Sequence, residues 1–481
     1  MNDLDKLIQS DSTAPAVEAD NSAIEKAIEL SRGYRAEDHD GNRLRIHLVL
    51  RSQSLADRLK RCPLNEEMAA NVELYAYTKE DLWAMNLLGI SPESSTRLDR
   101  KPITADSRQC VHLVVLGCGS QAESLAVHAA LTSHFPNYCQ DSSLRTRITM
   151  VVDSHKQLLP FQQRYRNLLL NSYRRTVTLN GDNVDCVVMA PQYANHRRDF
   201  VDVEWEFVEG TINDVPLTYK LQQWSNDEMQ QLTIALCHPD DDRNITEAFI
   251  LQSEINPDIP IWMRVKESTA IDFIRQSGQN SSLIPFGMSN SELPDMSDFI
   301  RMGQCVNFAY SQMKDISKED QERGMSDLSV AIEMPSEELL QELWNNPKLN
   351  TPKRWSNLFN AFTLRHKMSS LNHPVSEWGT LFAVSNKEVE QLSEVEHNRW
   401  SVEELILGFR PTTDEEHAAI LQDSSLKGKY RQEMIHDDLR NYYELGVDDS
   451  GLNVNRYDIG LTRTLPLVAY TYYHLKKQHH E

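Results

Sequence analysis

The apolar run at residues 110–116 ends in a turn, GCGSQAE, whose glycines are spaced to bind a phosphate. Gly117 and Gly119 form a G-x-G pair, Ala122 stands where a third glycine is often found, and Glu123 follows it. In a strand–turn–helix unit, the first glycine permits the turn, the second admits a pyrophosphate, and a small third residue lets the helix pack on the strand. The turn therefore predicts a dinucleotide site. The alternative is a similar sheet that binds another ligand or none.

Polar residues also follow two later apolar runs. Asp153 ends RITMVVD, where a carboxylate commonly binds ribose hydroxyls and would repel a 2′-phosphate; alternatively, it caps the next turn. The run ending in CHPDDDRN adds His238 and Asp240 as candidates for the same nucleotide site. Helix capping explains at least one of these acids. A magnesium or calcium site is disfavoured, because adjacent side chains seldom point the same way.

The segment EVEHNRW groups a third set of candidates on one predicted helix. Glu396 and Trp400 are four residues apart and share a face, while His397 and Arg399 point elsewhere. With Tyr443, this set could stack a purine on the indole and hold a phosphate or a cation. The alternative is structural, with Trp400 in the core and the charged residues holding helices together.

Hydrophobic periodicity predicts the elements that position these residues. Six apolar runs alternating with helical patterns indicate a doubly wound, Rossmann-like α/β sheet, although residues 157–200 have no readable layout. A small α/β unit with parallel strands precedes this sheet, and a mostly helical region follows it. A polar linker is expected at residues 95–109. The predicted parts are a disordered N-terminus (1–20), the small α/β unit (21–105), the nucleotide-binding domain (106–290) and the helical region (291–481).

Composition narrows the class of protein. The net charge of −22 argues against a nucleic acid or an anionic membrane as the main partner. The seven cysteines are odd in number and contain no C-x-x-C pair, which fits reduced thiols in the cytoplasm better than disulfides or a zinc site. The acidic N-terminus is unlike a secretory signal, and no apolar run has the length of a membrane helix. A cytoplasmic protein without a membrane span is expected.

Residues 110–290 resemble the TrkA-N-like domains of the regulator-of-potassium-conductance family. The resemblance rests on VHLVVLGCGSQAESLAVHAAL, ITMVVD, VEG and LTIALCHPDDDRNITEAFILQSEINPDIPIWMRV. It implies a domain that senses NAD or another adenine nucleotide without chemistry of its own, and that commonly pairs into homo-oligomers. Ala122 and Thr211 depart from the family's usual glycine and aspartate.

The C-terminal region resembles a bacterial ryanodine-receptor repeat domain, with its core signature at 388–470. The matching segments are EVEHNRWSVEELILGF, IHDDLRNYYEL and YDIGLTRTLP, with Asn441 in place of the family's proline. The combination of the two resemblances implies an intracellular ligand-responsive protein. Some relatives of this kind occur in nucleotide signalling or phage defence.

Three functions remain open on the sequence alone. The first is a nucleotide sensor, in which a small nucleotide ligand shifts a homo-oligomer or the activity of a protein partner. The second is an NAD-dependent or NAD-consuming enzyme, which would need an acid or base beside the ligand. The third is a non-catalytic interaction scaffold. The chain contains no G-x-S-x-G, H-E-x-x-H or G-x-x-x-x-G-K-[ST] motif, and this favours the sensor.

Overall fold

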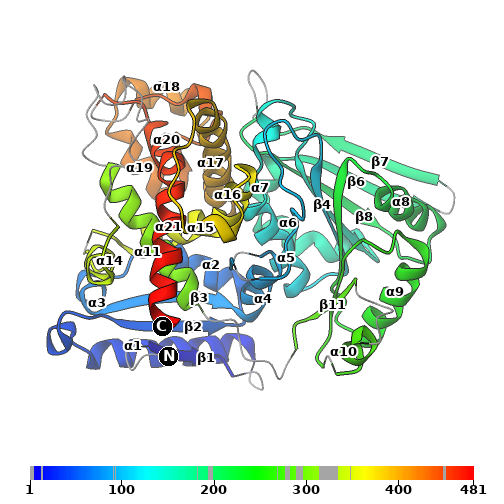
Figure 1. Cartoon of the computed structure of the whole chain (residues 1–481), viewed down its shortest axis with the longest axis horizontal. Helices are drawn as coiled ribbons and strands as arrows, with labels where there is room; N and C mark the ends of the chain where they lie inside the picture. Colours follow the sequence, from blue (N-terminus) through cyan, green and yellow to red (C-terminus); the bar gives the residue numbers. More distant parts are fainter. Residues whose placement is uncertain are drawn as a thin grey trace.

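The computed structural model describes residues 5–11, 15–89, 91–92, 94–180, 183–192, 199–267, 269–276, 282–288, 296–313, 334–346, 348–447 and 451–480. Its parts are a small sheet with helices, a large sheet with flanking helices and a helical region, coloured in Figure 1 from blue through cyan and green to red. The α/β class of the large, mostly parallel sheet and the helical character of the C-terminal region are therefore confirmed.

The small sheet has three parallel strands in the order β1-β2-β3. Its elements are β1 (Asp5–Gln9), α1 (Ala16–Gly33), η1 (Ala36–His39), β2 (Leu44–Leu50), α2 (Gln53–Arg61), α3 (Glu66–Asn71), β3 (Val72–Thr78) and α4 (Lys79–Leu87). The predicted parallel pairing of β2 with β3 is confirmed. Side chains of Ser52, Asn65 and Thr78 cap α2, α3 and α4, as short polar residues at these positions do.

The prediction of disorder over residues 1–20 is wrong where the structure describes that stretch; its other residues lie outside the described ranges. The stretch contains β1 and the start of α1. The buried carboxylate of Asp20 accepts hydrogen bonds from the Ser10 hydroxyl at 2.6 Å and from the Ser52 backbone N–H at 3.0 Å. These bonds tie α1 to the end of β2. The pattern concealed this order because most side chains of β1 face solvent.

The large sheet has eight strands in the order β11-β10-β9-β4-β5-β8-β6-β7. Its strands are β4 (Cys110–Leu116), β5 (Thr146–Val152), β6 (Tyr173–Asn180), β7 (Asn183–Met189), β8 (Val203–Glu209), β9 (Gln230–Leu236), β10 (Ile261–Arg264) and β11 (Leu283–Phe286). Its helices are α5 (Ser120–Thr132), η2 (Pro136–Cys139), η3 (His155–Leu158), α6 (Leu159–Arg164), α7 (Arg166–Leu170), α8 (Val215–Ser225), α9 (Asp241–Glu254) and α10 (Thr269–Gln276).

All six strands predicted from apolar runs are present as β4, β5, β8, β9, β10 and β11. The stretch 157–200, whose pattern predicts no layout, contains α6, α7 and the antiparallel hairpin β6–β7, while residues 181–182 and 193–198 lie outside the described residues. The hairpin joins the sheet through the parallel pairing of β6 with β8. All other neighbouring strands of this sheet also run parallel.

The helical region follows the large sheet. Its elements are α11 (Ser297–Met313), α14 (Glu337–Trp344), α15 (Thr351–Phe362), α16 (Leu364–Ser370), η4 (Val375–Glu377), α17 (Asn386–Ile406), β12 (Arg410–Pro411), α18 (Asp414–Gln422), α19 (Leu426–Gln432), β13 (Ile435–His436), η5 (Tyr442–Glu444), α20 (Arg456–Arg463) and α21 (Leu465–His480). The short parallel pair β12–β13 is absent from the sequence prediction, because two residues are too few to give an alternating pattern. No helix among the described residues is long and apolar enough to cross a membrane.

One hydrophobic core passes through all these parts. It includes Tyr75 of β3, Leu113 of β4 and Trp344 of α14, and the Trp344 indole N–H donates to the Tyr75 hydroxyl at 3.0 Å. The predicted linker contributes as well, because Asp99 is buried against the imidazole of His366, with 2.8 Å between Oδ1 and Nδ1. The small sheet, the large sheet and the helices are therefore packed as one body.

Candidate functional site

Gly117 and Asp153 directly follow β4 and β5 of the large sheet, and His238 lies two residues after the end of β9. β4 pairs in parallel with β5 on one side and with β9 on the other. Because parallel strands end at the same edge of a sheet, these residues share one edge. The structure thus brings together candidates that are far apart in the sequence.

The glycine turn adopts a backbone that other residues rarely tolerate. Gly117 and Gly119 both have a φ of +107°. A Cβ atom on Gly117 would lie 2.8 Å from the backbone carbonyl carbon of Cys237 and from the backbone nitrogen of His238. A Cβ atom on Gly119 would meet nothing within 4 Å. The first glycine therefore permits close packing against the end of β9, while the second faces open space.

Helix α5 begins at this open position. Gly119 is its N-cap, and the described side chains supply no capping hydrogen bond. Backbone N–H groups in a first helical turn carry partial positive charge and attract anions. Ala122 is fully buried, which meets the expected need for a small packing residue. Ser120 is exposed and donates to the Glu80 carboxylate at 3.2 Å, so the small α/β unit extends to the rim of the turn.

Glu123, the carboxylate beside the glycine turn, is engaged by a neighbouring helix. Its Oε2 accepts a hydrogen bond from the Arg164 guanidinium at 2.5 Å, and Arg164 also donates to Ser54 of α2 at 3.1 Å. These contacts join α5, α6 and the small unit behind the turn. Glu123 therefore helps to hold α5 in place through its ion pair with Arg164.

Asp153 makes a two-pronged ion pair with Arg243 of α9. Its Oδ2 and Oδ1 atoms accept from Nη1 and Nη2 at 2.9 and 2.8 Å. The hydrogen bonds from Arg243 lower the pKa of Asp153, so it is ionised at neutral pH. Its side chain is still 44% exposed. The next helical turn is capped by Ser154 rather than by Asp153.

Arg243 belongs to a chain of charged side chains that sequence reasoning missed. Its Nε donates to Glu247 at 2.7 Å, and Glu247 contacts Nε2 of the buried His238 at 2.8 Å. Burial raises the pKa of Glu247, but the hydrogen bonds from His238 and Arg243 outweigh it and lower the pKa overall. Asp240 caps α9 by accepting from the Asp242 N–H at 3.0 Å. The signal was the arginine in CHPDDDRN, the one cation in that turn.

These contacts define what the edge can do chemically. The glycine turn offers N–H donors to an anion, Asp153 offers an ionised acceptor, and Arg243 offers a guanidinium. All of these are binding groups. His238 is committed to Glu247 behind them, and Asp240 to its helix cap.

In the helical region, Glu396 and Arg399 lie in the middle of α17, and their side chains are buried. Both residues are 1% exposed. The Arg399 Nε donates to both oxygens of Glu396 at 3.0 Å, and its Nη1 donates to Glu403 at 2.7 Å. Glu396 also accepts from Lys367 and from Asn360. Burial raises the pKa of Glu396, but the charges of Arg399 and Lys367 lower it to about 2. This network joins α17 to α15 and α16.

The remaining candidates of that region have different surroundings. His397 is buried and donates from Nε2 to the Arg440 carbonyl at 2.7 Å. Trp400 is partly buried against the main core, with its ring 4.9 Å from that of His436. Tyr443 is 54% exposed and donates to the Glu394 carboxylate at 3.0 Å. The five predicted residues therefore do not share one exposed surface.

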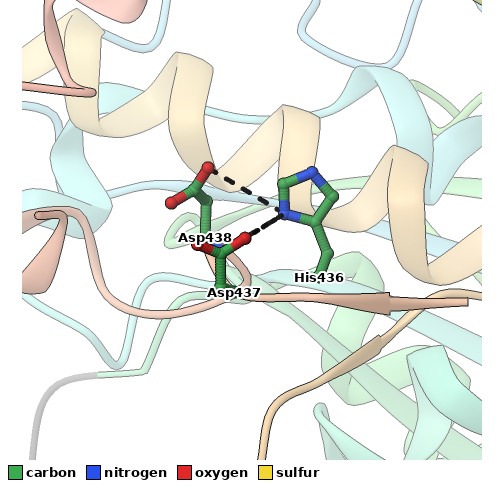
Figure 2. Close-up of side chains that lie close together, drawn as sticks. All are labelled: His436, Asp437 and Asp438. Carbon is green, nitrogen blue, oxygen red and sulfur yellow. Dashed lines mark hydrogen bonds and ion pairs between the residues drawn. The ribbon is translucent and has the colours of Figure 1, made fainter. Parts of the chain in front are cut away.

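Figure 2 shows a cluster that the sequence analysis did not single out: His436, Asp437 and Asp438, which could hold a metal ion. The His436 Nδ1 lies 3.9 and 4.0 Å from the nearest carboxylate oxygens. The same nitrogen accepts the Asp438 backbone N–H at 3.2 Å, and Asp437 is paired with Lys427 at 3.2 Å. The atoms a cation would need are thus already hydrogen-bonded or paired, and the cluster holds α19 against β13.

Glu404, in the last turn of α17, should make stability depend on pH. Burial raises its pKa to about 8, and the charge of Glu403 acts in the same direction. Between its unfolded pKa of 4.5 and about 8, the folded protein binds the extra proton. Its contribution to stability is thus complete below pH 4.5 and is lost as the pH rises toward 8, at about 1.4 kcal/mol per pH unit.

From pH 4.5 to about 8 this slope amounts to about 5 kcal/mol. Because Glu404 is partly exposed, solvent screens its charge, and we expect Glu404→Gln to raise the free energy of unfolding by about 2 kcal/mol at pH 8 and to leave it unchanged at pH 4. Urea denaturation at both pH values measures this. The control is Glu228→Gln, which neutralises an exposed carboxylate. Equal effects of the two substitutions at pH 8 would contradict the raised pKa.

The whole chain was also compared with known proteins. No protein-family model matches it, and neither a curated protein nor a solved structure does. The functional assignment therefore rests on the geometry of the sheet edge.

Proposed function

We propose that this protein binds an adenine nucleotide or dinucleotide, such as NAD, at the carboxyl edge of the large sheet and acts as a sensor of it. The observation that carries the proposal is the turn at Gly117 and Gly119, with two φ angles of +107° before the uncapped start of α5. Such a turn lets a pyrophosphate approach the backbone N–H groups.

The order of the parallel strands supports the same site. From β8 to β11 the strands stand as β8-β5-β4-β9-β10-β11. Numbered along the chain without the hairpin, this is 3-2-1-4-5-6, the order of dinucleotide-binding sheets. In such sheets the ligand binds where the order reverses, which here lies between β4 and β9. The Rossmann-like assignment is part of this proposal.

Asp153 is the residue proposed to bind the ribose. Its ionised carboxylate can accept further hydrogen bonds beyond the two from Arg243, because two carboxylate oxygens offer about four acceptor positions. A ribose diol would donate to the free positions. The Arg243 guanidinium would remain beside the sugar, where it can also face a phosphate.

A sensor fits this edge better than an enzyme. The exposed groups, namely the glycine turn, Asp153 and Arg243, can bind a ligand. The imidazole of His238, which could act as an acid or a base, is instead buried against Glu247. Helix α5 also packs on α17, so a ligand at the start of α5 has a direct contact with the helical region. The ryanodine-receptor-repeat assignment and a second ligand site around Glu396 and Trp400 remain proposals from the resemblance, and that site would require the buried partners of Glu396 to be exchanged.

Titration calorimetry with NAD, NADH and ATP tests the nucleotide site. We expect Asp153→Asn to weaken the binding of the best of these probes by about 10- to 100-fold, since hydrogen bonds to a charged group contribute about 1.5–3 kcal/mol. Asp242→Asn is the matched control, because it removes an exposed carboxylate from the same edge. Equal affinities of the two variants would remove Asp153 from the site.

The same protein separates the alternative functions. Turnover of NAD or NADH by the purified wild type would support an NAD-dependent or NAD-consuming enzyme. If none of the three probes binds at millimolar concentration, the scaffold is favoured and the sensor is wrong. Binding without turnover supports the sensor.

A further inference from the structure

Strand β7 ends the large sheet with an exposed apolar edge. In Figure 1 it lies at the outer margin of the sheet, and within the described residues its only strand partner is β6. Val184, Val187 and Val188 are 54%, 58% and 64% exposed, and Cys186 is exposed as well. A long apolar edge strand is a template for pairing with another strand, and proteins usually protect such edges with charges, prolines or bulges. β7 has one charged residue, Asp185.

The register of the hairpin shows which backbone groups face outward. Asn180 pairs with Asn183 across two intervening residues, and Cys186 pairs with Val177. In an antiparallel pair, hydrogen-bonded and non-hydrogen-bonded positions alternate, and a two-residue connection closes on a hydrogen-bonded pair. Val184, Cys186 and Val188 are then the non-hydrogen-bonded positions toward β6. Their N–H and C=O groups point to the free edge.

We propose that β7 pairs antiparallel with β7 of a second copy of this chain, across a two-fold axis at Cys186. This register places Cys186 opposite its own copy and Val184 opposite Val188 on both sides. Three outward-facing residues in each strand give about six backbone hydrogen bonds. The two sheets become one continuous sheet, and the proposal is independent of any nucleotide.

The outward-facing positions of β7 are complementary to themselves, and this favours a second copy of this chain as the strand that pairs with β7. The three outward positions are apolar and symmetric about Cys186, so the strand matches itself when reversed. Asp185 lies opposite Val187 of the other copy, which avoids the like-charge pair that an axis at Asp185 would create. Each copy has a net charge of −22, so contact between copies requires a face with few acids. The outer strand, with Arg174 and Arg175 on β6 behind it, is such a face.

Light scattering across a range of protein concentrations tests this interface with the full chain. We expect a mass of twice 55.3 kDa for the wild type. The double substitution Val184→Lys and Val188→Lys should weaken self-association at least tenfold, because it places lysines along the paired edge. Both sites are exposed, so the fold should tolerate the change. The control is Val215→Lys, at a 74% exposed position on α8, which should leave the mass unchanged.

Crosslinking gives a readout that does not depend on disrupting the strand. Opposite residues in a hydrogen-bonded antiparallel pair have Cα atoms about 5.5 Å apart. A short bismaleimide should therefore join two copies through Cys186, and Cys186→Ser should abolish the crosslinked dimer. A wild type that stays monomeric up to about 100 μM contradicts the proposal, as does a dimer that the lysines leave unchanged. A dimer that the lysines weaken but that crosslinks equally well without Cys186 would overturn the register.

Discussion

Replacing Arg399 with glutamine is expected to lower the free energy of unfolding by about 3–5 kcal/mol. The guanidinium is buried between Glu396 and Glu403 and donates to both carboxylates. Glutamine cannot balance two negative charges, so the substitution leaves a buried carboxylate at Glu403 without its cation. Glu396 retains Lys367 and suffers less. Urea denaturation at pH 7 measures the loss.

Two further variants identify the cause of that loss. Arg58→Gln removes an exposed arginine from α2 and should change stability by less than about 0.5 kcal/mol. The double variant Arg399→Gln with Glu403→Gln removes the stranded charge together with its partner. It should be more stable than Arg399→Gln alone. If Arg399→Gln unfolds like the wild type, the charge network does not stabilise the fold, and a ligand-binding role for Arg399 is favoured instead.

Replacing Gly117 with alanine should destabilise the fold by about 3–5 kcal/mol, and replacing Gly119 with alanine by about 1–3 kcal/mol. Both positions share a φ of +107°, which costs an L-residue about 1–3 kcal/mol. At Gly117 the new methyl group would also lie 2.8 Å from the backbone of Cys237, and overpacking adds about 1–3 kcal/mol. At Gly119 the space is open. Comparing the two alanine variants therefore separates the cost of steric overlap, present only at position 117, from the cost of backbone strain, present at both positions.

Urea midpoints of the two alanine variants provide the measurement. The matched control is Gly428→Ala in α19, where the Cβ atom also meets nothing and the φ is not positive. It should leave the stability unchanged or raise it slightly, since alanine favours helix. Equal losses at positions 117 and 119 would show that the strand ends move apart to accept a side chain, contrary to the tight packing described.

The strands of the large sheet were predictable because they are buried on both faces. A run such as that of β4 is buried throughout and apolar at every position except His112, as is typical of a strand inside a parallel sheet. β1 and the hairpin β6–β7 lie at sheet edges and mix polar with apolar side chains, so their pattern does not separate them from loops. Their positions depend on tertiary pairing rather than on local periodicity.

The candidate site was predictable only in part, for a related reason. The glycine turn is local, and its spacing is sufficient to place it between β4 and α5. The partner of Asp153 is Arg243, 90 residues further along the chain, and no spacing rule links them. The burial of Arg399 was equally hidden, because charged residues are mostly exposed and the balancing charge of Lys367 comes from another helix. Such pairs appear only when the helices are packed.

The core shared by the two ends of the sequence has a consequence for synthesis on the ribosome. Tyr75 of β3 receives its hydrogen bond from Trp344, a partner 269 residues later in the chain. At a synthesis rate of about 5–20 residues per second, roughly 15–50 s pass between the synthesis of β3 and the synthesis of α14. During that interval the surface that α14 covers is open to other chains. Slow translation between these segments, or a shortage of chaperone, should therefore reduce the yield of folded protein even though the finished molecule is unchanged.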